Sequence, residues 1–288
     1  MSEHQTRVLV LGATGKIGSS LLRVFASSPG LDVMGTVRAS HGELLPATLR
    51  SKLVGNVDVD NFDTVIAAFA QARPDVVINC VGMIKQLPGA SEPLAAIPLN
   101  ALLPHRLANL CAATESRLVQ ISSDCVFSGD KGNYLESDPA DAQDLYGRSK
   151  ALGEVDYPHA VTLRTSTIGR ALQGNHSLLD WFLSTTGPVK GFRRAIFSGV
   201  PAHELARIIR DFVIPFPELR GLYHVSGEPI DKYTLLKLIA IRYGRDTQID
   251  PDDDFVIDRS LNSGRFRDAT GYAPQDWPKL IDAMYEFG

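Results

Sequence analysis

The chain of 288 residues contains few cysteines and no long hydrophobic run. Its three cysteines, Cys80, Cys111 and Cys125, are odd in number and widely spaced, which argues against a disulfide framework and against a metal site, so we predict reduced thiols. The apolar run VLVL near the amino terminus is too short for the core of a signal peptide, and no later run approaches the length of a membrane span. We therefore expect a cytoplasmic protein that does not bind membranes.

The chain also lacks a strong charge of either sign. Its formal net charge is -4, and no block of like charge is longer than the one formed by Asp252, Asp253 and Asp254, so we expect no nucleic-acid partner. With 44% hydrophobic and 22% charged residues, the composition is typical of a globular protein. The length allows one large domain or two modest ones.

The first motif of the chain combines a short apolar strand, a glycine-rich turn and a helix. Arg7 to Leu11 is predicted to be a short strand with the apolar residues VLVL, the turn reads GATGKIG, and apolar residues then recur at helical spacing as far as Phe25. Such a turn lets backbone amides approach a diphosphate, and the amino end of the helix adds a positive dipole. A glycine-rich turn without a ligand is the alternative. The candidate cofactor residues here are Gly12, Ala13, Thr14, Gly15, Lys16, Ile17 and Gly18.

Arg38 bears on the choice of cofactor. It ends the second predicted strand and lies 20 positions beyond Gly18, where an NAD site usually places a carboxylate for the ribose hydroxyls. A guanidinium instead suits a 2'-phosphate, so we predict NADP as the preferred cofactor, with NAD as the second possibility. The alternative is an ordinary exposed arginine.

Two further strand ends supply candidate contacts. Asp58 and Val59 follow the third predicted strand, at a position that can flank an adenine ring. Lys85, in the loop after the fourth strand, is a candidate for contact with a substrate phosphate, and a solvated loop lysine is the alternative. The residues expected beneath the cofactor ribose are Cys80, Val81 and Gly82.

Strand and helix patterns alternate along the first 170 residues. This order requires a parallel, doubly wound sheet with right-handed crossovers, so we predict an α/β fold of the Rossmann type. The expected strands are residues 7–11, 32–37, 52–55, 75–80, 117–123 and 160–164, and the expected helices are residues 63–70, 100–114 and 145–155.

Beyond residue 170 the pattern loosens. Leu205, Ile208, Ile209 and Phe212 predict a helix, and residues 221–225 predict a strand that rejoins the first sheet. We therefore expect an NAD(P)-binding domain over residues 1–170, completed by about 196–227, and a smaller α/β substrate-binding domain over residues 171–288. Other expected elements there are helices at 178–183 and 233–241, a turn-rich stretch at 259–272 and a terminal helix; Trp181, in the first of these helices, is a candidate substrate contact.

The stretch from Ile121 to Lys150 contains the side chains that a carbonyl-reducing site needs. Tyr146 and Lys150 are four residues apart, so a helix places them one turn apart on the same face. A nearby ammonium favours the phenolate form of a tyrosine and so eases proton exchange. Ser123 ends an apolar strand, facing the crevice where parallel sheets bind ligands. Taken alone, the tyrosine and lysine pair would favour a surface helix with a snorkelling lysine over a catalytic pair.

Five segments together resemble the extended short-chain dehydrogenase/reductase family, and specifically its dTDP-4-dehydrorhamnose reductase branch. They read GATGKIG, NCVGMIKQ, ISSDCVFSG, YLESDP and YGRSKALGE. The resemblance implies that Tyr146 is the proton donor, that Lys150 modulates it and binds the nicotinamide ribose, and that Ser123 orients the substrate carbonyl. It also implies that Asn175 contacts a sugar nucleotide, and by analogy it suggests a homodimer. Asp124 and Cys125 are further candidate substrate contacts, although the family commonly has a tyrosine at the position of Cys125.

The resemblance implies an NADP-dependent reductase that transfers a hydride to the C4 carbonyl of a nucleotide-activated keto sugar. A sugar-nucleotide 4,6-dehydratase or epimerase is a second possibility, but dehydratases place two adjacent acids after the strand hydroxyl, and only Asp124 is present here. A third is a non-catalytic regulator that binds NADP and a partner enzyme. The complete set of Ser123, Tyr146 and Lys150 argues against the third, because a pure binding module has no chemical need for it.

Overall fold

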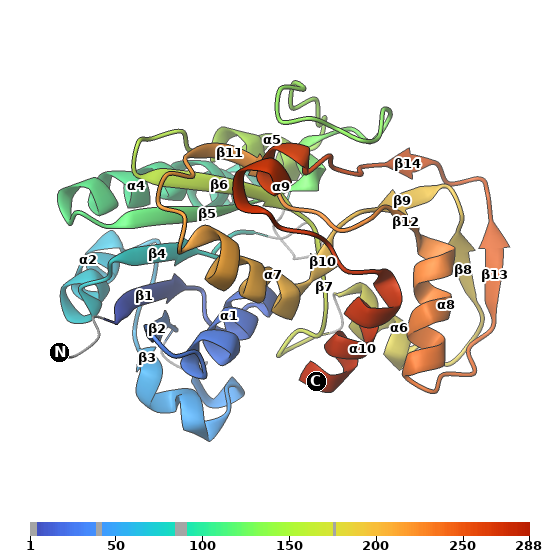
Figure 1. Cartoon of the computed structure of the whole chain (residues 1–288), viewed down its shortest axis with the longest axis horizontal. Coiled ribbons are helices and arrows are strands. Elements are labelled where there is room, and N and C mark those ends of the chain that lie inside the picture. Colours follow the sequence, from blue (N-terminus) through green and yellow to red (C-terminus); the bar gives the residue numbers. More distant parts are fainter. Residues whose placement is uncertain (1–4, 39–41, 84–90, 175–176) are drawn as a thin grey trace.

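The computed structural model describes residues 5–38, 42–83, 91–174 and 177–288 (Figure 1). Its main feature is a sheet of seven parallel strands in the order β11-β6-β5-β4-β1-β2-β3. The sequential order reverses between β1 and β4, as in a doubly wound fold, so the predicted fold class is confirmed. The strands are β1 Thr6–Leu11, β2 Leu31–Thr36, β3 Leu53–Val54, β4 Val76–Asn79, β5 Arg117–Ser123, β6 Ala160–Thr165 and β11 Gly221–His224.

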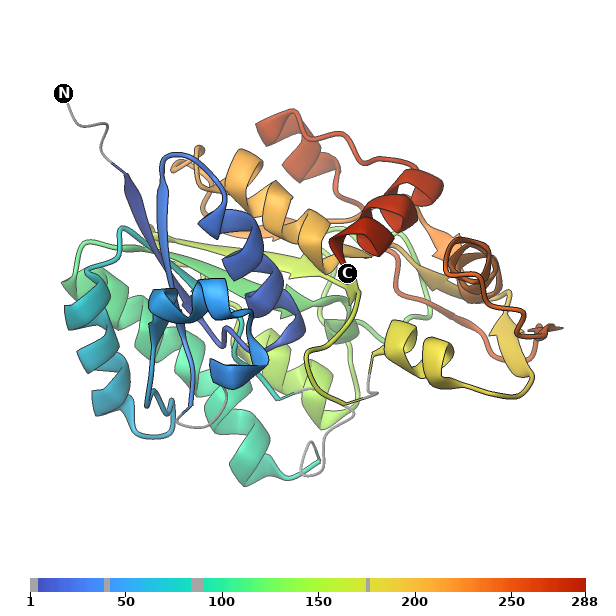
Figure 2. The ribbon, with the colours of Figure 1, turned by 90° about the horizontal axis from the view of Figure 1, so that it is seen from below.

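Helices cover both faces of this sheet (Figure 2). The side chains of β1 alternate between the two layers, because Val8 and Val10 join one hydrophobic core while Leu9 and Leu11 join the other. Strands buried on both sides in this way carry nearly continuous apolar sequence, which is why they were recognisable. The covering helices are α1 Lys16–Ala26 and α7 Ala202–Ile208 on one face, and α2 Phe62–Ala72 and α4 Leu103–Ala113 on the other.

The chain returns to the sheet after leaving it. Strand β11 pairs in parallel with β6, and α7 packs along α1. The helix predicted around Leu205 continues beyond α7 as a π-helical segment, Ile209–Val213. The chain therefore begins a second unit between residues 167 and 201, completes the first sheet at β11, and then returns to the second unit.

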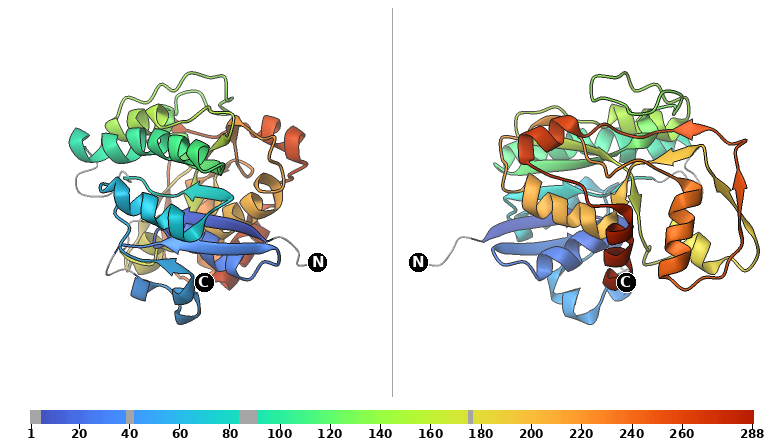
Figure 3. Two further views of the ribbon diagram at one scale, coloured as in Figure 1. Left: turned by 90° about the vertical axis from the view of Figure 1, so that its left-hand side faces the viewer. Right: turned by 45° about the vertical axis from the view of Figure 1, so that its right-hand side comes forward.

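That second unit, which we call the carboxyl-terminal lobe, consists of small sheets and three helices around their own hydrophobic core (Figure 3, right). Phe182, Leu236 and Leu280 from the three helices meet in this core. The strands are β7 Thr167–Ile168, β8 Val189–Phe192, β9 Ala195–Phe197, β10 Val200–Pro201, β12 Ile230–Asp231, β13 Ile249–Asp252 and β14 Ile257–Asp258; the helices are α6 Leu178–Ser184, α8 Lys232–Arg242 and α10 Trp277–Phe287.

Two predictions of local structure were wrong. The stretch 259–272, predicted to be turn-rich, contains the helix α9, Gly264–Thr270, which packs Phe266 into the core of the main sheet. A seven-residue helix with two buried residues is too short to show a period. The helix predicted at 100–114 is longer, because α3, Pro93–Ile97, and a π-helical segment, Pro98–Leu102, precede α4.

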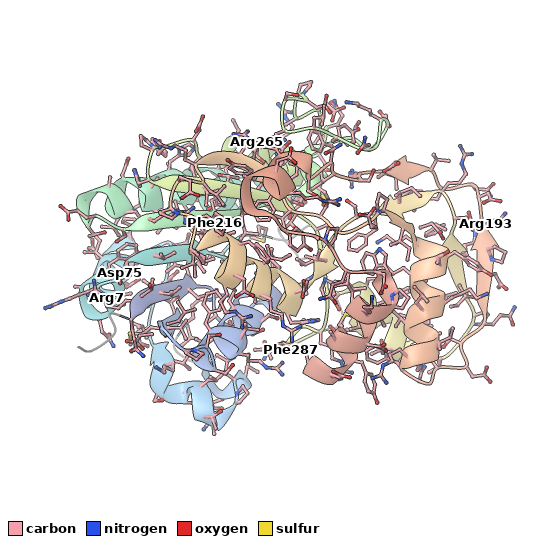
Figure 4. All side chains as sticks on the ribbon, in the orientation of Figure 1. Arg7, Asp75, Arg193, Phe216, Arg265 and Phe287 are labelled. Atoms are coloured by element: carbon pink, nitrogen blue, oxygen red, sulfur yellow. The ribbon has the colours of Figure 1, made fainter. Side chains whose placement is uncertain are left out.

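The far end of the sheet is held by a structural ion pair. Arg7 and Asp75 point toward each other in Figure 4, and the distance from Arg7 Nη2 to Asp75 Oδ1 is 2.7 Å. Arg7 is the second residue of β1 and Asp75 directly precedes β4, so both lie at the end of the sheet opposite the glycine-rich turn.

Among the helices in the described ranges, none has the length and apolar character needed to cross a bilayer.

Candidate active site

The glycine-rich turn directly follows β1, at the point where the strand order of the sheet reverses. Gly12 has φ +80°, and a Cβ on it would lie 3.1 Å from Val81 Cγ2, so the loops after β1 and β4 lie against each other. A Cβ on Gly18 would lie 2.1 Å from the Gly12 carbonyl oxygen, which no larger residue tolerates. Gly15 begins α1 without a side-chain cap, so the first amides of the helix are available to a diphosphate. These residues fit a dinucleotide.

The end of β2 contains no carboxylate. Thr36 fastens the glycine-rich turn to it, because the Gly12 amide donates to Thr36 Oγ1 at 3.2 Å and the Ala13 amide donates to the Thr36 carbonyl oxygen at 3.1 Å. Arg38 follows as an exposed residue. Asp58 is exposed too, and its carboxylate accepts from the Asp60 amide at 3.2 Å in the turn before α2. The cofactor roles of Arg38, Asp58 and Val59 stay predictions.

The helix α5, Leu145–Leu152, brings Tyr146 to Ser123. Asp144 begins it by accepting from the Gly147 amide at 2.9 Å. A Cβ on Gly147 would lie 2.2 Å from the Cys125 carbonyl oxygen, so this glycine lets the helix pack directly on the segment after β5. The Tyr146 phenol lies near enough to Ser123 there for a hydrogen bond between them to affect its pKa. Helix α5 ends at Leu152, three residues before the predicted end at Val155.

Burial raises the pKa of the Tyr146 phenol, and the nearby Cys125 raises it further, while the hydrogen bond with Ser123 opposes the shift. The net shift of this pKa is opposite to the one that a neighbouring ammonium alone would cause. Desolvation dominates because the side chain is partly buried where α5 packs on the segment after β5. Tyr146 is therefore protonated at neutral pH, which is the form that a proton donor requires.

Lys150 is buried on the same helix, and its Nζ donates to the Ile121 carbonyl oxygen at 2.7 Å. Burial lowers its pKa to about 8, although the charges of Glu154 and Cys80 oppose the shift. A Cβ built on Gly82 would lie 3.8 Å from Lys150 Nζ. The ammonium thus lies beside the loop that follows β4, which was predicted to pass beneath the cofactor.

Asp124 and Cys125 follow Ser123 and are part of the same cluster. Ser123 Oγ donates to Asp124 Oδ1 at 3.2 Å and accepts from the Cys125 amide at 3.1 Å. Burial raises the pKa of the Asp124 carboxyl, against the opposing charge of Arg259. Burial and the charge of Asp124 raise the pKa of the Cys125 thiol to about 12, so the thiol stays protonated.

Asn100 is a site residue that the sequence pattern did not reveal. It is buried in the π-helical segment, where its Oδ1 accepts from the Met83 amide at 2.9 Å and its Nδ2 donates to Ser149 Oγ at 3.1 Å. It therefore ties the loop after β4 to α5. The signal in the sequence was an asparagine within the apolar run PLNALL. An asparagine side chain buried among apolar residues needs hydrogen-bond partners, so it indicates a link to another segment.

A buried ion pair below the site was also missed. Arg164 on β6 holds Glu154 by two hydrogen bonds, from Nε to Oε1 at 2.7 Å and from Nη2 to Oε2 at 2.6 Å. Ser122 Oγ donates to the same Glu154 Oε1 at 2.7 Å, and Arg164 Nη1 lies 3.3 Å from His224 Nε2. Burial and the adjacent Arg164 lower the pKa of His224 to about 4, so that imidazole is neutral. The signal was the acid at the end of YGRSKALGE.

The remaining candidates have mixed outcomes. Lys16 reaches strand β7, where its Nζ donates to the Thr167 carbonyl oxygen at 2.6 Å. Trp181 is 41% exposed on α6, and its role as a substrate contact stays a prediction. Lys85 and Asn175 lie outside the described residues.

A doubly wound sheet with a glycine-rich turn at its switch point, and a tyrosine, lysine and serine beside it, is the arrangement of the extended short-chain dehydrogenase/reductases. The sequence matches the family described as RmlD substrate binding domain over residues 6–252. The chain belongs to this family, so the predicted resemblance is confirmed.

Curated relatives agree with the family. The chain is 34% identical over 149 residues to the dTDP-4-dehydrorhamnose reductase of Streptomyces griseus, a match that covers 51% of this chain and 43% of that protein. It is 27% identical over 239 residues to the dTDP-4-dehydrorhamnose reductase of Aggregatibacter actinomycetemcomitans, covering 77% and 74%. It is also 31% identical over 150 residues to methionine adenosyltransferase 2 subunit beta of Mus musculus, covering 51% and 41%.

Solved structures share the fold over nearly the whole chain. A hypothetical dTDP-4-dehydrorhamnose reductase from Sulfolobus tokodaii is 26% identical with a TM-score of 0.76, covering 94% of this chain and 98% of that one. The dTDP-4-dehydrorhamnose reductase of Bacillus anthracis in complex with NADP is 20% identical with a TM-score of 0.79, covering 99% of each chain. The dTDP-glucose 4,6-dehydratase of the same organism, in complex with NAD, is 14% identical with a TM-score of 0.76, covering 98% and 97%.

Proposed function

We propose that this protein is an NADP-dependent reductase of a nucleotide-activated keto sugar, acting on the C4 carbonyl. The observation that carries the proposal is the partly buried Tyr146 beside Ser123, with a phenol whose pKa is raised by burial. A phenol and a hydroxyl that converge at one place can both donate to a carbonyl oxygen. Relatives from two bacteria are named dTDP-4-dehydrorhamnose reductase, which supports this substrate class.

The residues of this chain have distinct roles in the proposed reaction. Ser123 donates a hydrogen bond that holds the carbonyl oxygen, and Tyr146 gives its proton to that oxygen as negative charge develops. Lys150, protonated below pH of about 8, stabilises the tyrosinate that remains. Asn100 keeps the loop after β4 and helix α5 in register, so that these groups stay aligned.

The cofactor would be held by the glycine-rich turn and by the end of β2. Gly12, Gly15 and Gly18 leave room for a diphosphate, and Arg38 supplies a cation at the end of β2 in place of the acid typical of NAD sites. When bound, a reduced nicotinamide supplies the hydride. Structural neighbours are known in complex with NADP or with NAD, and the arginine favours NADP here.

The test is NADPH consumption against a panel of 4-keto nucleotide sugars that varies the nucleotide and the sugar. We expect turnover of at least one member, and a decrease of roughly 10² to 10⁴-fold in kcat for Tyr146→Phe, since the phenol supplies acid catalysis of that size. The variant should bind NADPH as tightly as the parent, because the aromatic ring is retained. Full turnover by Tyr146→Phe would contradict the assignment.

A second candidate is a subunit that binds NADP and a partner enzyme without catalysis. It is favoured by the match to methionine adenosyltransferase 2 subunit beta. Passing the tagged protein through a lysate of its source and finding a stoichiometric larger enzyme, together with no turnover of any keto sugar, would support it. A sugar-nucleotide epimerase would instead retain NAD through purification and consume no NADPH.

A further inference from the structure

The Lys150 ammonium is buried at the candidate active site. Lys150 is 7% exposed, and its Nζ donates to the Ile121 carbonyl oxygen at 2.7 Å. A carbonyl oxygen is uncharged, so this hydrogen bond alone does not offset the loss of water around the ammonium. A lysine buried in this way releases its proton at a lower pH unless an anion lies nearby. The charge of Lys150 therefore depends on the groups that surround it.

The titratable groups near Lys150 differ in charge. Glu154 and Cys80 act on Lys150 through their charge, and Tyr146 lies one helical turn before it. Burial raises the pKa of the Cys80 thiol to about 12 and also raises the pKa of the Tyr146 phenol, so both groups are neutral at physiological pH. Glu154 is a carboxylate paired with Arg164. Among these neighbours, Glu154 is therefore the one that carries a negative charge.

The end of helix α5 and strand β5 place Glu154 beside Lys150. Glu154 lies four residues further along the chain, and the Gly153 amide still donates to the Lys150 carbonyl oxygen at 3.1 Å, so the chain remains wound up to that point. Lys150 holds the carbonyl oxygen of Ile121, and Glu154 Oε1 accepts from Ser122 Oγ at 2.7 Å. The two side chains therefore contact adjacent residues of one strand.

Arg164, on the neighbouring strand β6, fixes the position of the carboxylate. It donates to both oxygens of Glu154, and its Nη1 lies 3.3 Å from His224 Nε2. His224 Nδ1 lies 3.0 Å from the Tyr134 carbonyl oxygen, which can only accept, so Nδ1 carries the hydrogen and Nε2 accepts from Arg164. With its partners committed in this way, the Glu154 carboxylate has one position.

We propose that Glu154 is a positioning residue for the reaction, whose carboxylate keeps the Lys150 ammonium charged inside the protein. This inference rests on the proposed function, because the ammonium serves there to stabilise the tyrosinate that remains after proton transfer. A fixed negative charge close to a buried ammonium opposes the cost of removing that ammonium from water. The buried ion pair of Glu154 and Arg164 then has a chemical task beside its structural one.

The experiment follows the Lys150 proton directly, so that it does not depend on turnover. Protein carrying 13C at the lysine Cε atoms is titrated by NMR from about pH 6 to 10, and the Lys150 resonance is assigned by its absence in Lys150→Arg. The wild-type midpoint should lie near pH 8, because burial lowers the pKa of Lys150 to about 8. In Glu154→Gln the midpoint should fall by about one pH unit, since a nearby anion is lost.

Further variants separate the charge of Glu154 from its shape. Glu154→Asp keeps the carboxylate, so its midpoint should lie closer to that of the wild type than to that of Glu154→Gln. Asp156→Asn is the matched control, because it removes an exposed carboxylate two residues further along the same segment and should leave the midpoint unchanged. If Glu154→Gln does not fold, combining it with Arg164→Met leaves neither charge of the pair alone, and the midpoint should fall there too.

The pH profile of kcat/KM is the second readout. A purely structural role of Glu154 would lower kcat/KM by the same factor at every pH. Loss of the Lys150 charge instead moves the fall at alkaline pH to a lower pH, so the ratio of wild type to Glu154→Gln should widen by about tenfold between pH 6 and 9.

Three outcomes would overturn the proposal. The first is an unchanged Lys150 midpoint in Glu154→Gln or in the double variant. The second is an equal fall in Glu154→Asp and Glu154→Gln, which would show that shape matters and charge does not. The third is an equal fall in Asp156→Asn. If the midpoint falls as expected while the wild type reduces no keto sugar, Glu154 still controls Lys150 and the reductase function is wrong.

Discussion

The main sheet and the carboxyl-terminal lobe hold their charges in opposite ways. Beneath the end of the sheet that carries Ser123, the side chains of Arg164 and Glu154 are 5% and 12% exposed and are joined to Ser122 and His224. At the outer edge of the lobe, Arg193 pairs with Asp253, and their side chains are 52% and 49% exposed (Figure 4). One pair belongs to a closed network, whereas the other lies in solvent.

The difference shows where the molecule needs a fixed geometry. A buried pair with all its hydrogen bonds made allows only one arrangement, and this one lies next to the residues that position Lys150. An exposed pair is screened by water and leaves its segment free to vary. We therefore expect the candidate site to be more sensitive to changes in the buried network than to changes at the outer edge of the lobe.

The largest effect should follow from opening the buried network. In Glu154→Gln the Arg164 guanidinium stays buried without a counter-charge, so we expect the free energy of unfolding to fall by about 3 to 5 kcal/mol. Urea denaturation measures it. Combining this change with Arg164→Met should recover part of the loss, because the uncompensated charge is then gone. A loss below about 1 kcal/mol in the single variant would show that the pair behaves like a surface one.

Arg38→Asp tests the cofactor preference of the sheet. The new carboxylate repels a 2'-phosphate and can accept from ribose hydroxyls, so NADPH affinity should fall by about 10- to 100-fold while NADH affinity is kept or improved. Fluorescence titration with each cofactor measures both. The exposed Arg50→Asp change is a control for net charge alone. Equal losses for NADPH and NADH would contradict the role of Arg38.

The pH dependence tests Lys150. Its pKa is lowered to about 8, so the ammonium loses its proton above that pH, and kcat/KM should fall by about tenfold for each further pH unit. The pKa of Lys16 is also lowered to about 8. If a Lys16→Gln variant keeps the fall of kcat/KM at alkaline pH, that fall is assigned to Lys150. Lys150→Arg should lack this fall, since its guanidinium does not titrate. A flat profile to pH 10 in the wild type would refute the prediction.

The lowered pKa values of Lys16 and Lys150 should also make the free energy of unfolding depend on pH. Their pKa values fall from 10.5 to about 8 on folding, so between those pH values the unfolded chain binds more protons than the folded one. Their contribution to the free energy of unfolding therefore increases as pH rises through this window. Comparing urea midpoints at pH 8 and 10 for wild type and Lys16→Gln isolates the part due to Lys16.

The smallest effect is expected at the edge of the lobe. Asp253→Asn removes the partner of Arg193 where both side chains are exposed, so the free energy of unfolding should change by less than about 1 kcal/mol. Urea denaturation beside Glu154→Gln gives the direct comparison of the two regions. A loss as large as that of the buried pair would erase the distinction between them.

Much of this structure was predictable from local patterns. The strands of the sheet carry continuous apolar runs because both faces are covered, and the return of the chain at β11 followed from one more such run. Short elements with few buried residues gave no period, which is why α9 and the small sheets of the lobe escaped prediction.

The sequence by itself determined the doubly wound sheet, the glycine-rich turn and the family, because each depends on residue types at fixed spacing along the chain. Only the tertiary structure decided that the pKa of Tyr146 is raised by burial and that Asn100 and Glu154 support the site. The physical reason is that burial and charge at a point depend on every segment that packs there, and these segments are far apart in sequence.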